Sequence, residues 1–211
     1  MAYPVNVTVQ PLVKNRDRVT TFFRFFLALP HIILVGGAAF GFGGGMSGGG
    51  RFSLGSEGGL LGAVAVFLAI VSWFTILVSG THITGIRQFT LFFMRWRVRA
   101  IAYLMLLEDA YPPFGDEPYP SSIEIADPAG PRDRVTVAFR VILAIPQFIV
   151  LVFVMLAWCV TTIIAWFGIL FTGDYPAGLY DFGVGAMRWM LRVQAYMLLL
   201  VDDYPPFSLS E

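Results

Sequence analysis

Charged residues are scarce in this chain: they make up 13% of its 211 residues, and fourteen basic side chains balance fourteen acidic ones. A typical soluble domain carries about 25% charged residues. A disordered chain needs more charge, and a soluble nucleic-acid binder needs a basic surplus, so this composition excludes both classes. We therefore expect no nucleic acid among the partners.

Cysteine and histidine are also rare. Cys159 is the only cysteine, which excludes an internal disulfide scaffold and a thiolate metal site. The two histidines, His31 and His82, are too few for a metal site, which usually takes about three or four ligands. No serine or cysteine stands in a recognisable pattern with a base. The sequence therefore predicts no catalytic residue, no metal and no cofactor.

Apolar residues are abundant, at 57% of the chain with a mean hydropathy of +0.72. A soluble fold of this length has too little interior to bury so much apolar surface. The composition therefore indicates a mainly α-helical, multi-pass membrane protein.

The chain contains an internal duplication. The fifteen residues from Arg16 onward recur at an offset of 116 with ten identities, and the forty-two residues from Trp73 onward recur at an offset of 93 with twenty identities. Self-similarity of this kind marks repeated structural units. We predict two tandem copies, residues 1–117 and 118–211.

The difference between the two offsets marks an insertion of 23 residues in the first copy. It falls within residues 36–59, where twelve of the twenty-four residues are glycine, and its site in the second copy is near Val152. Because insertions are tolerated in loops rather than within packed or spanning helices, we expect the chain to turn near residues 152–156.

This turn predicts four transmembrane helices arranged as two tandem hairpins. The uncharged residues 141–173 would form a single helix of about 50 Å, longer than a hydrocarbon core of about 30 Å. The alternative is one long, tilted span in the second copy. The four predicted spans cover residues 19–36, 60–79, 135–152 and 153–172.

The positive-inside rule assigns an orientation to the four-span arrangement. Thirteen of the fourteen basic residues fall on one side, and the exception is Arg51. Both termini are therefore expected in the cytoplasm. The glycine-rich loop, with Arg51 and Glu57, would face outward.

Each hairpin is preceded by a strand pattern and followed by a third helix. Apolar residues alternate at Val5, Val7 and Val9 and again at Ile123 and Ile125, which predicts two short strands that could pair into a ribbon. The third helices carry arginines on one face and apolar side chains on the other, so we place them in the membrane interface. The alternative is that each of these third helices crosses the membrane as a further span. These helices are expected over residues 86–108 and 179–201.

The repeated motifs resemble a bacterial membrane family known as domain of unknown function 4389. The resemblance implies a multi-pass protein of the bacterial inner membrane and implies no activity. The motifs that carry it are an Arg-Asp-Arg stretch leading into Leu-Ala-Leu-Pro-His (27–31) or Leu-Ala-Ile-Pro-Gln (143–147), Arg-Trp-x-x-Arg-x-x-x-Tyr (95–103 and 188–196) and Asp-x-Tyr-Pro-Pro-Phe (109–114 and 202–207).

Arginine and aspartate form the one polar feature that both copies repeat. Guanidinium groups suit lipid phosphate oxygens, which favours headgroup binding, but a structural ion-pair network is the interpretation that we prefer. Arg95 and Asp109 are too far apart along a straight helix to touch, so pairing would occur between elements or copies. The candidate residues are Arg24, Arg95, Arg99, Asp109, Arg140, Arg188, Arg192 and Asp202.

The sequence thus predicts a non-enzymatic integral membrane protein that acts as a structural, accessory or scaffold subunit. Its expected partners are membrane lipids, including anionic ones, and further copies of itself or other membrane subunits. The alternative function is lipid binding, or transport through a channel, with the paired arginines contacting phosphate headgroups.

Overall fold

The computed structural model describes residues 3–37, 45–47, 51–53, 59–128, 130 and 132–210. Within them the protein is mainly helical, with two small two-stranded sheets. The elements follow in the order β1 (Val5–Val9), α1 (Arg18–Val35), β2 (Gly45–Ser47), β3 (Arg51–Ser53), α2 (Gly59–Ser79), α3 (Thr84–Leu104), β4 (Ser121–Ile125), α4 (Arg134–Ala138), α5 (Arg140–Thr172) and α6 (Ala177–Met197).

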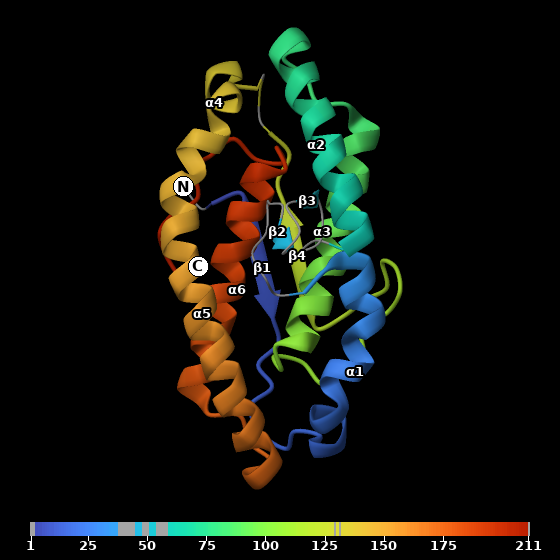
Figure 1. The fold of residues 1–211 in the computed structure, drawn as a ribbon, viewed down its shortest axis with the longest axis vertical. Helices are drawn as coiled ribbons and strands as arrows, with labels where there is room; N and C mark the ends of the chain where they lie inside the picture. Colours follow the sequence, from blue (N-terminus) through green and yellow to red (C-terminus); the bar gives the residue numbers. More distant parts are fainter. Residues whose placement is uncertain are drawn as a thin grey trace.

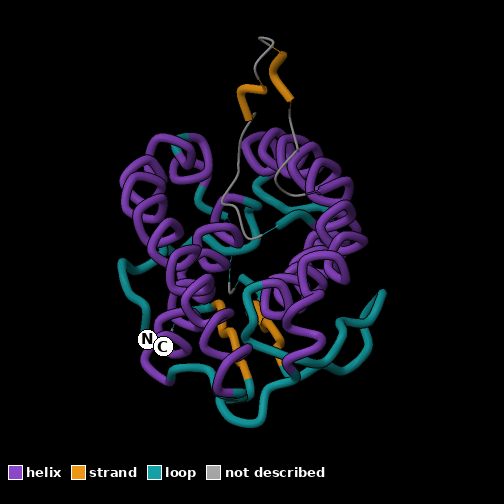
Figure 2. The backbone as a smooth tube through the Cα atoms, turned by 60° about the horizontal axis from the view of Figure 1, so that its bottom comes forward, coloured by secondary structure: helices purple, strands orange, loops and turns teal. Residues whose placement is uncertain are grey.

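Two long helical rows flank the molecule. α5 runs along one side, α1 and α2 follow one another along the other side, and α3 and α6 lie between these rows (Figure 1). The β1–β4 sheet packs against α3 and α6. The β2–β3 hairpin projects away from the rest of the molecule (Figure 2). The core therefore lies around α3 and α6, and the two rows form its outer layer.

The repeated Arg-Asp-Arg-Val-Thr sequence starts a helix in both copies. The side chains of Asp17 and Asp133 each accept hydrogen bonds from the backbone nitrogens two and three residues farther along the chain. A carboxylate in this position satisfies amide groups that lack a partner within the helix, a stabilisation of about 1 kcal/mol. The aspartate of the motif is therefore a helix cap.

β1 and β4, the two strands that the alternating pattern predicted, pair with each other, and the pair is antiparallel. Val7 pairs with Ile123, the residue 116 positions farther along, so the ribbon is centred on equivalent positions of the two copies. Val5, Val7 and Ile123 are buried, and the hydroxyl groups of Thr8 and Ser122 hydrogen-bond at 2.8 Å on the exposed side. The sheet thus joins the two copies directly.

The predicted helical hairpin of the second copy is wrong. α5 is one continuous helix of 33 residues without a turn near residues 152–156. It ends only at Gly173, which adopts a left-handed conformation with a φ of 83°. No proline follows Pro146 within this helix. Interrupting it among apolar side chains would leave backbone polar groups unpaired, so the helix continues.

In the first copy the corresponding helix is interrupted rather than folded back. The twelve residues from Arg24 to Val35 and the 21 residues of α2 together match the 33 residues of α5. The two helices abut, because a Cβ atom added to Gly59 would lie 2.6 Å from the backbone nitrogen of Gly36. The glycine-rich insertion therefore leaves the helical row at this break.

Three helices, α1, α2 and α5, are long and apolar enough to cross a membrane. Their mean hydropathies are 1.5, 2.5 and 2.7 over the most apolar eighteen residues of each, and most of those residues are not buried within the protein. Large side chains such as Phe67 and Phe153 are exposed on them. An apolar surface of this extent indicates a membrane protein. The described residues provide three candidate spans rather than the four predicted.

The predicted one-sided distribution of basic residues depended on the absent hairpin. The backbone nitrogen of Arg16 donates to the carbonyl oxygen of Gly173 at 2.8 Å, at the end of α5. The backbone nitrogen of Arg132 donates to the carbonyl oxygen of Gly80 at 3.4 Å, close to the start of the second copy's helical row. Because α5 does not turn back, Arg16 and Arg132 lie at opposite ends of the molecule. We predicted that the glycine-rich insertion, with Arg51 and Glu57, faces outward; the side chains of these two residues lie outside the part of the chain that the structure describes.

The third helix of each copy forms close to its predicted position, but it does not lie on the surface. α3 and α6 begin two residues and end four residues before the predicted bounds. Most of their residues are buried, since α1 and α2 cover one face of α3, α5 covers one face of α6, and the strands pack on both helices. The amphipathic pattern reflects packing between protein layers rather than an interfacial position.

Candidate functional site

The first copy holds a buried cluster of two arginines around Asp109. The Oδ1 atom of Asp109 accepts hydrogen bonds from Nη2 of Arg16 at 2.7 Å and from Nη2 of Arg24 at 2.6 Å. Nη2 of Arg16 also donates to the carbonyl oxygen of Leu106 at 2.6 Å. The guanidinium carbon of Arg24 lies 4.2 Å from the ring centroid of Tyr103. This cluster ties the start of α1 to the segment that follows α3.

The second copy repeats this cluster around Asp202. Its Oδ1 atom lies 2.9 Å from Nη2 of Arg132 and 2.8 Å from Nη2 of Arg140. Nη2 of Arg132 donates to the carbonyl oxygen of Leu199 at 2.6 Å, and the guanidinium carbon of Arg140 lies 4.3 Å from the ring centroid of Tyr196. Every member stands at the offset of 116 or 93 from its counterpart in the first copy.

The backbone at the ends of α3 and α6 is shaped to complete these clusters. Leu106 and Leu199 have positive φ angles of 64° and 61°. A residue other than glycine in this region is uncommon, and it is held there only when surrounding contacts compensate. In both copies the compensating contact is the hydrogen bond from an arginine to the leucine carbonyl oxygen.

The two clusters differ in how completely their first arginine is bonded. Nε and Nη1 of Arg16 donate to Asp109 Oδ2 at 3.0 Å and to the carbonyl oxygen of Leu12 at 2.6 Å. Nε and Nη1 of Arg132 have no hydrogen-bond partner among the described residues. Burial would raise the pKa of Asp109, but its hydrogen bonds and the charge of Arg16 outweigh this effect and lower the pKa.

A second group of arginines lies on α3. Arg95 and Arg99 pair with opposite oxygens of Asp116 at 3.0 and 3.1 Å, and Arg99 also donates to the carbonyl oxygen of Gly115 at 2.7 Å. Arg95 thus pairs with a different carboxylate from Asp109. The Arg95 and Asp116 side chains are 42% and 46% exposed, so this pair contributes little to stability.

The equivalent arginines of α6 bond to the backbone. Nε of Arg188 donates to the carbonyl oxygen of Val7 at 3.1 Å, and Nη1 of Arg192 donates to that of Ser210 at 2.8 Å. These contacts hold β1 and the C-terminal tail against α6. The eight predicted arginines and aspartates therefore divide into four groups, two around the cluster aspartates, one on α3 and one on α6, rather than forming one site.

His31 and Gln147 occupy equivalent positions and serve the same purpose. Nδ1 of His31 accepts a hydrogen bond from Nε1 of Trp96 at 3.0 Å, and Oε1 of Gln147 accepts one from Nε1 of Trp189 at 2.8 Å. Both acceptors are buried. A buried indole N–H requires an acceptor, so the exchange of histidine for glutamine preserves a structural contact.

Glu108 is a buried acid that the sequence analysis did not single out. Its side chain accepts a hydrogen bond from Oγ of Ser121 at 3.0 Å, and the residue is 2% exposed. Burial raises the pKa of Glu108 to about 7. Val201 stands at the equivalent position. The difference between Glu108 and Val201 was the sequence signal that could have pointed to this acid. In the same way, the repetition of Arg16 as Arg132 could have marked these two arginines as members of the clusters.

Comparison with known proteins establishes the family. The model of the family described as "Domain of unknown function (DUF4389)" matches residues 58–115 and 134–208, which is more than half of the chain. The chain therefore belongs to this family, and the two matched segments agree with two copies of its domain. No curated protein and no solved structure matches the chain.

Proposed function

We propose that this member of an uncharacterised family is a non-enzymatic scaffold subunit, held in the bacterial inner membrane by α1, α2 and α5. The observation that carries the proposal is the use of its polar side chains. The arginines and aspartates of both clusters bind each other and backbone carbonyl groups, so they support the fold rather than face a substrate.

Headgroup binding by the paired arginines has less support than this structural role. Arg24 and Arg140 are buried, and each lies between an aspartate and a tyrosine ring. A lipid phosphate would have to displace a carboxylate from a desolvated pair, which is unfavourable.

The distribution of exposed side chains supports immersion of the helical rows. The outer faces of α1, α2 and α5 are apolar, whereas exposed charges such as Glu124 lie on the sheet, midway along the molecule (Figure 1). A charged side chain at the bilayer centre is costly. We therefore expect the rows to lie in lipid and the sheet to remain in water. Tyr3 donates to the carbonyl oxygen of Asp203 at 3.1 Å, so both chain ends would share the cytoplasmic side.

The single cysteine offers a direct test of this anchoring. Cys159 is exposed on α5. In native membranes it should resist a water-soluble maleimide and react once the membrane is dissolved in a denaturing detergent. Glu124→Cys in a Cys159→Ala background is the matched control and should react from the aqueous side. Rapid labelling of Cys159 in membranes that have been permeabilised but not dissolved would contradict the proposal.

Native mass spectrometry after mild extraction tests the scaffold role. We expect additional protein mass, either further copies of this chain or other subunits. Arg95→Ala combined with Arg188→Ala, on the sheet side of α3 and α6, should reduce that mass, whereas Lys14→Ala should not. A bare monomer, or normal assembly in the double variant, would refute the scaffold role.

A further inference from the structure

A mostly apolar groove runs between α1 and α5. Its volume is about 330 Å³, and its lining includes Phe22, Phe25, Leu104, Ile163 and Trp166. Both helices are candidate membrane spans, and Phe22, Phe25 and Ile163 are exposed. Because the core of a bilayer holds no water, acyl chains fill a groove in a surface that faces lipid. The groove is therefore a place where one lipid molecule can be held.

Two aromatic rings mark one end of this groove. Phe22 is the lining residue nearest the start of α1, and Trp166 is the one nearest the end of α5. Their ring centroids lie 6.2 Å apart with an interplanar angle of 26°. Nε1 of Trp166 donates to the carbonyl oxygen of Thr21 at 3.0 Å, which fixes the indole. Tryptophan favours the level of the lipid headgroups, so this end of the groove is its headgroup end.

Arg18 lies just beyond the aromatic end. It is the first residue of α1, one turn before Phe22 and on the same face of the helix. A Cβ atom added to Gly173, which directly follows α5, would lie 3.1 Å from Nη2 of Arg18. The guanidinium group therefore packs over the end of α5, where the helix dipole favours a cation. The start of α1 and the end of α5 come together at the lower end of the molecule (Figure 1).

The side chain of Arg18 is available to a ligand. Arg18 is exposed, and it forms no ion pair and donates no hydrogen bond within the part of the chain that the structure describes. The carboxylates of Asp17 and Asp174 accept hydrogen bonds from backbone amides instead. Arg24 also lines the groove, but its Nη2 is bound to Asp109 and its Nη1 to a backbone carbonyl oxygen. Arg18 is thus the cation that can receive an anionic group at this end.

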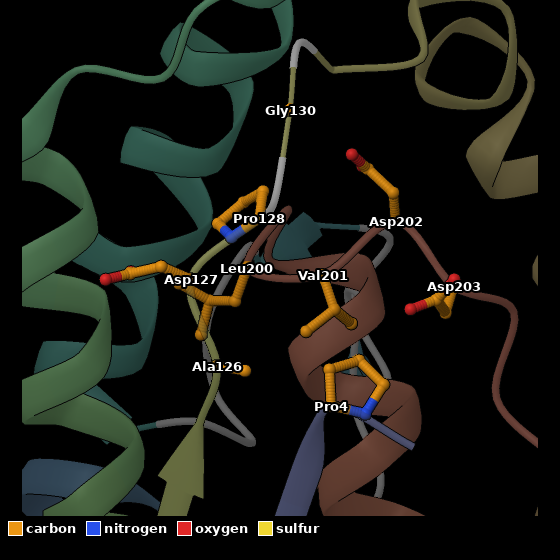
Figure 3. Close-up of a pocket in the computed structure, with 9 residues that line it drawn as sticks. All are labelled: Pro4, Ala126, Asp127, Pro128, Gly130, Leu200, Val201, Asp202 and Asp203. Atoms are coloured by element: carbon orange, nitrogen blue, oxygen red, sulfur yellow. The ribbon is translucent and has the colours of Figure 1, made fainter. Parts of the chain in front are cut away.

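A cavity of equal volume elsewhere in the molecule has the opposite charge. It also measures about 330 Å³, and its described lining includes Asp127, Asp202 and Asp203 but no arginine or lysine. Asp127 follows β4, and the other two aspartates follow α6 (Figure 3). These carboxylates would repel a phosphate group. Charge as well as shape therefore distinguishes the groove between α1 and α5 as a place for an anionic headgroup.

The second copy repeats the arginine but not the aromatic wall of the groove. Arg134 corresponds to Arg18 and is exposed, and a Cβ atom added to Gly80 would lie 3.0 Å from its Nη2. Ala138 and Val141, however, stand at the positions equivalent to Phe22 and Phe25. Arg134 therefore offers a matched control, because it carries the same charge in the same local setting without these two phenylalanines.

We infer that the groove between α1 and α5 binds an anionic phospholipid, with an acyl chain along the groove and the phosphate group on Arg18. A guanidinium group can donate two parallel hydrogen bonds to phosphate oxygens. A zwitterionic headgroup fits less well, because its own cation would be repelled by Arg18. The inference rests on the proposed immersion of α1 and α5 in the membrane, and it assigns the headgroup to an arginine outside the buried clusters.

Native mass spectrometry of the full chain in maltoside micelles measures this binding. The probes are phosphatidylglycerol and phosphatidylcholine, each added at the same mole fraction. The native chain should bind phosphatidylglycerol more tightly than phosphatidylcholine. Arg18→Gln should weaken the binding of phosphatidylglycerol about fivefold, the effect expected for one arginine at an anionic lipid surface, and should leave the binding of phosphatidylcholine unchanged.

Two further variants separate the groove from the charge. Ile163→Trp fills the groove from an exposed position while keeping Arg18, and it should weaken the binding of both lipids. Arg134→Gln removes the same charge at the opposite end and should leave binding unchanged. The site would be overturned by equal binding of the two lipids to the native chain, by equal losses in Arg18→Gln and Arg134→Gln, or by normal binding in Ile163→Trp.

Failure of this site can be distinguished from failure of the proposed immersion. If α5 does not lie in lipid, Cys159 reacts with the water-soluble maleimide in native membranes. If α5 is immersed but the groove selects no headgroup, Cys159 stays protected and the two lipids bind equally. The labelling and the lipid measurement are therefore made on the same preparations of the native chain and of Arg18→Gln.

Discussion

The two ends of the helical rows start from the same residues and are completed differently. At one end every guanidinium nitrogen of Arg16 donates to the protein, and the buried rings of Tyr175 and Tyr180 lie nearby. At the other end Nε and Nη1 of Arg132 are buried and have no hydrogen-bond partner among the described residues, and a cavity lined by Arg132 and Arg87 lies there. The repeated residues thus carry the fold, and the unrepeated ones mark where the copies have diverged.

Two further differences place extra ionisable groups in the interior of the first copy. Glu108 corresponds to Val201, and Arg97, which is buried, corresponds to Met190. Arg97 donates to the carbonyl oxygen of Val35, the last residue of α1. That carbonyl faces the break in the helical row, whereas in α5 the helix simply continues. Arg97 therefore compensates for the interruption.

The largest effect is expected from removing the carboxylate at the centre of a cluster. Asp109 accepts hydrogen bonds from two nitrogens of Arg16, from Arg24 and from the backbone nitrogen of Asp17. Asp202 pairs with its two arginines through a single carboxylate oxygen. Breaking a buried pair costs roughly 3–5 kcal/mol. Asp109→Asn should approach this loss in the free energy of unfolding, and Asp202→Asn should lose less. Reversible unfolding in mixed micelles measures both, and equal losses would contradict the difference between clusters.

The next effect concerns pH and the acid present in one copy only. The folded-state pKa of Glu108 is about 7, above its ordinary value of 4.5. The folded protein therefore holds this proton more tightly, and the resulting stabilisation is present below pH 4.5 and lost as the pH rises through 7. The total change is about 3 kcal/mol, from 1.36 kcal/mol per pKa unit. Glu108→Gln should remove this pH dependence of unfolding. An unchanged profile in the variant would assign the dependence to another group.

Arg97→Met tests whether this arginine compensates for the broken helix. We expect a loss of about 2 kcal/mol in the free energy of unfolding, the value of a buried hydrogen bond from a charged donor. In a chain lacking residues 36–58, Val35 is joined to Gly59 and the helix can continue as α5 does. There the same substitution should cost much less. Equal costs in the two backgrounds would show that Arg97 serves another purpose.

The smallest effect should follow exchange of the tryptophan acceptors. His31→Gln copies the second copy, so the free energy of unfolding should change by less than about 0.5 kcal/mol, whereas His31→Leu should lose about 1 kcal/mol by removing the acceptor of Trp96. Thermal unfolding of the two variants side by side distinguishes these values. A larger loss for glutamine than for leucine would show that ring packing, rather than hydrogen bonding, governs this site.

Local features of the fold could be predicted because their physical causes are local. The capping aspartates lie two or three residues from the amides that they bind, and the strands follow from alternation over five residues. The bounds of α3 and α6 were likewise close. The site was only partly foreseen: the arginines and aspartates were identified, but Arg16, Arg132 and Glu108 were not.

By itself, the sequence determined that this is a membrane protein of two related copies, because composition and identity between segments do not depend on folding. Only the tertiary structure decided that α5 runs unbroken, that α3 and α6 lie inside, and that Arg16 pairs with Asp109, 93 residues away. The reason is that apolar composition marks a stretch as helical without fixing whether the helix runs on or turns, which depends on the segments that pack beside it. The choice of a partner for a buried guanidinium depends on which distant segments pack beside it.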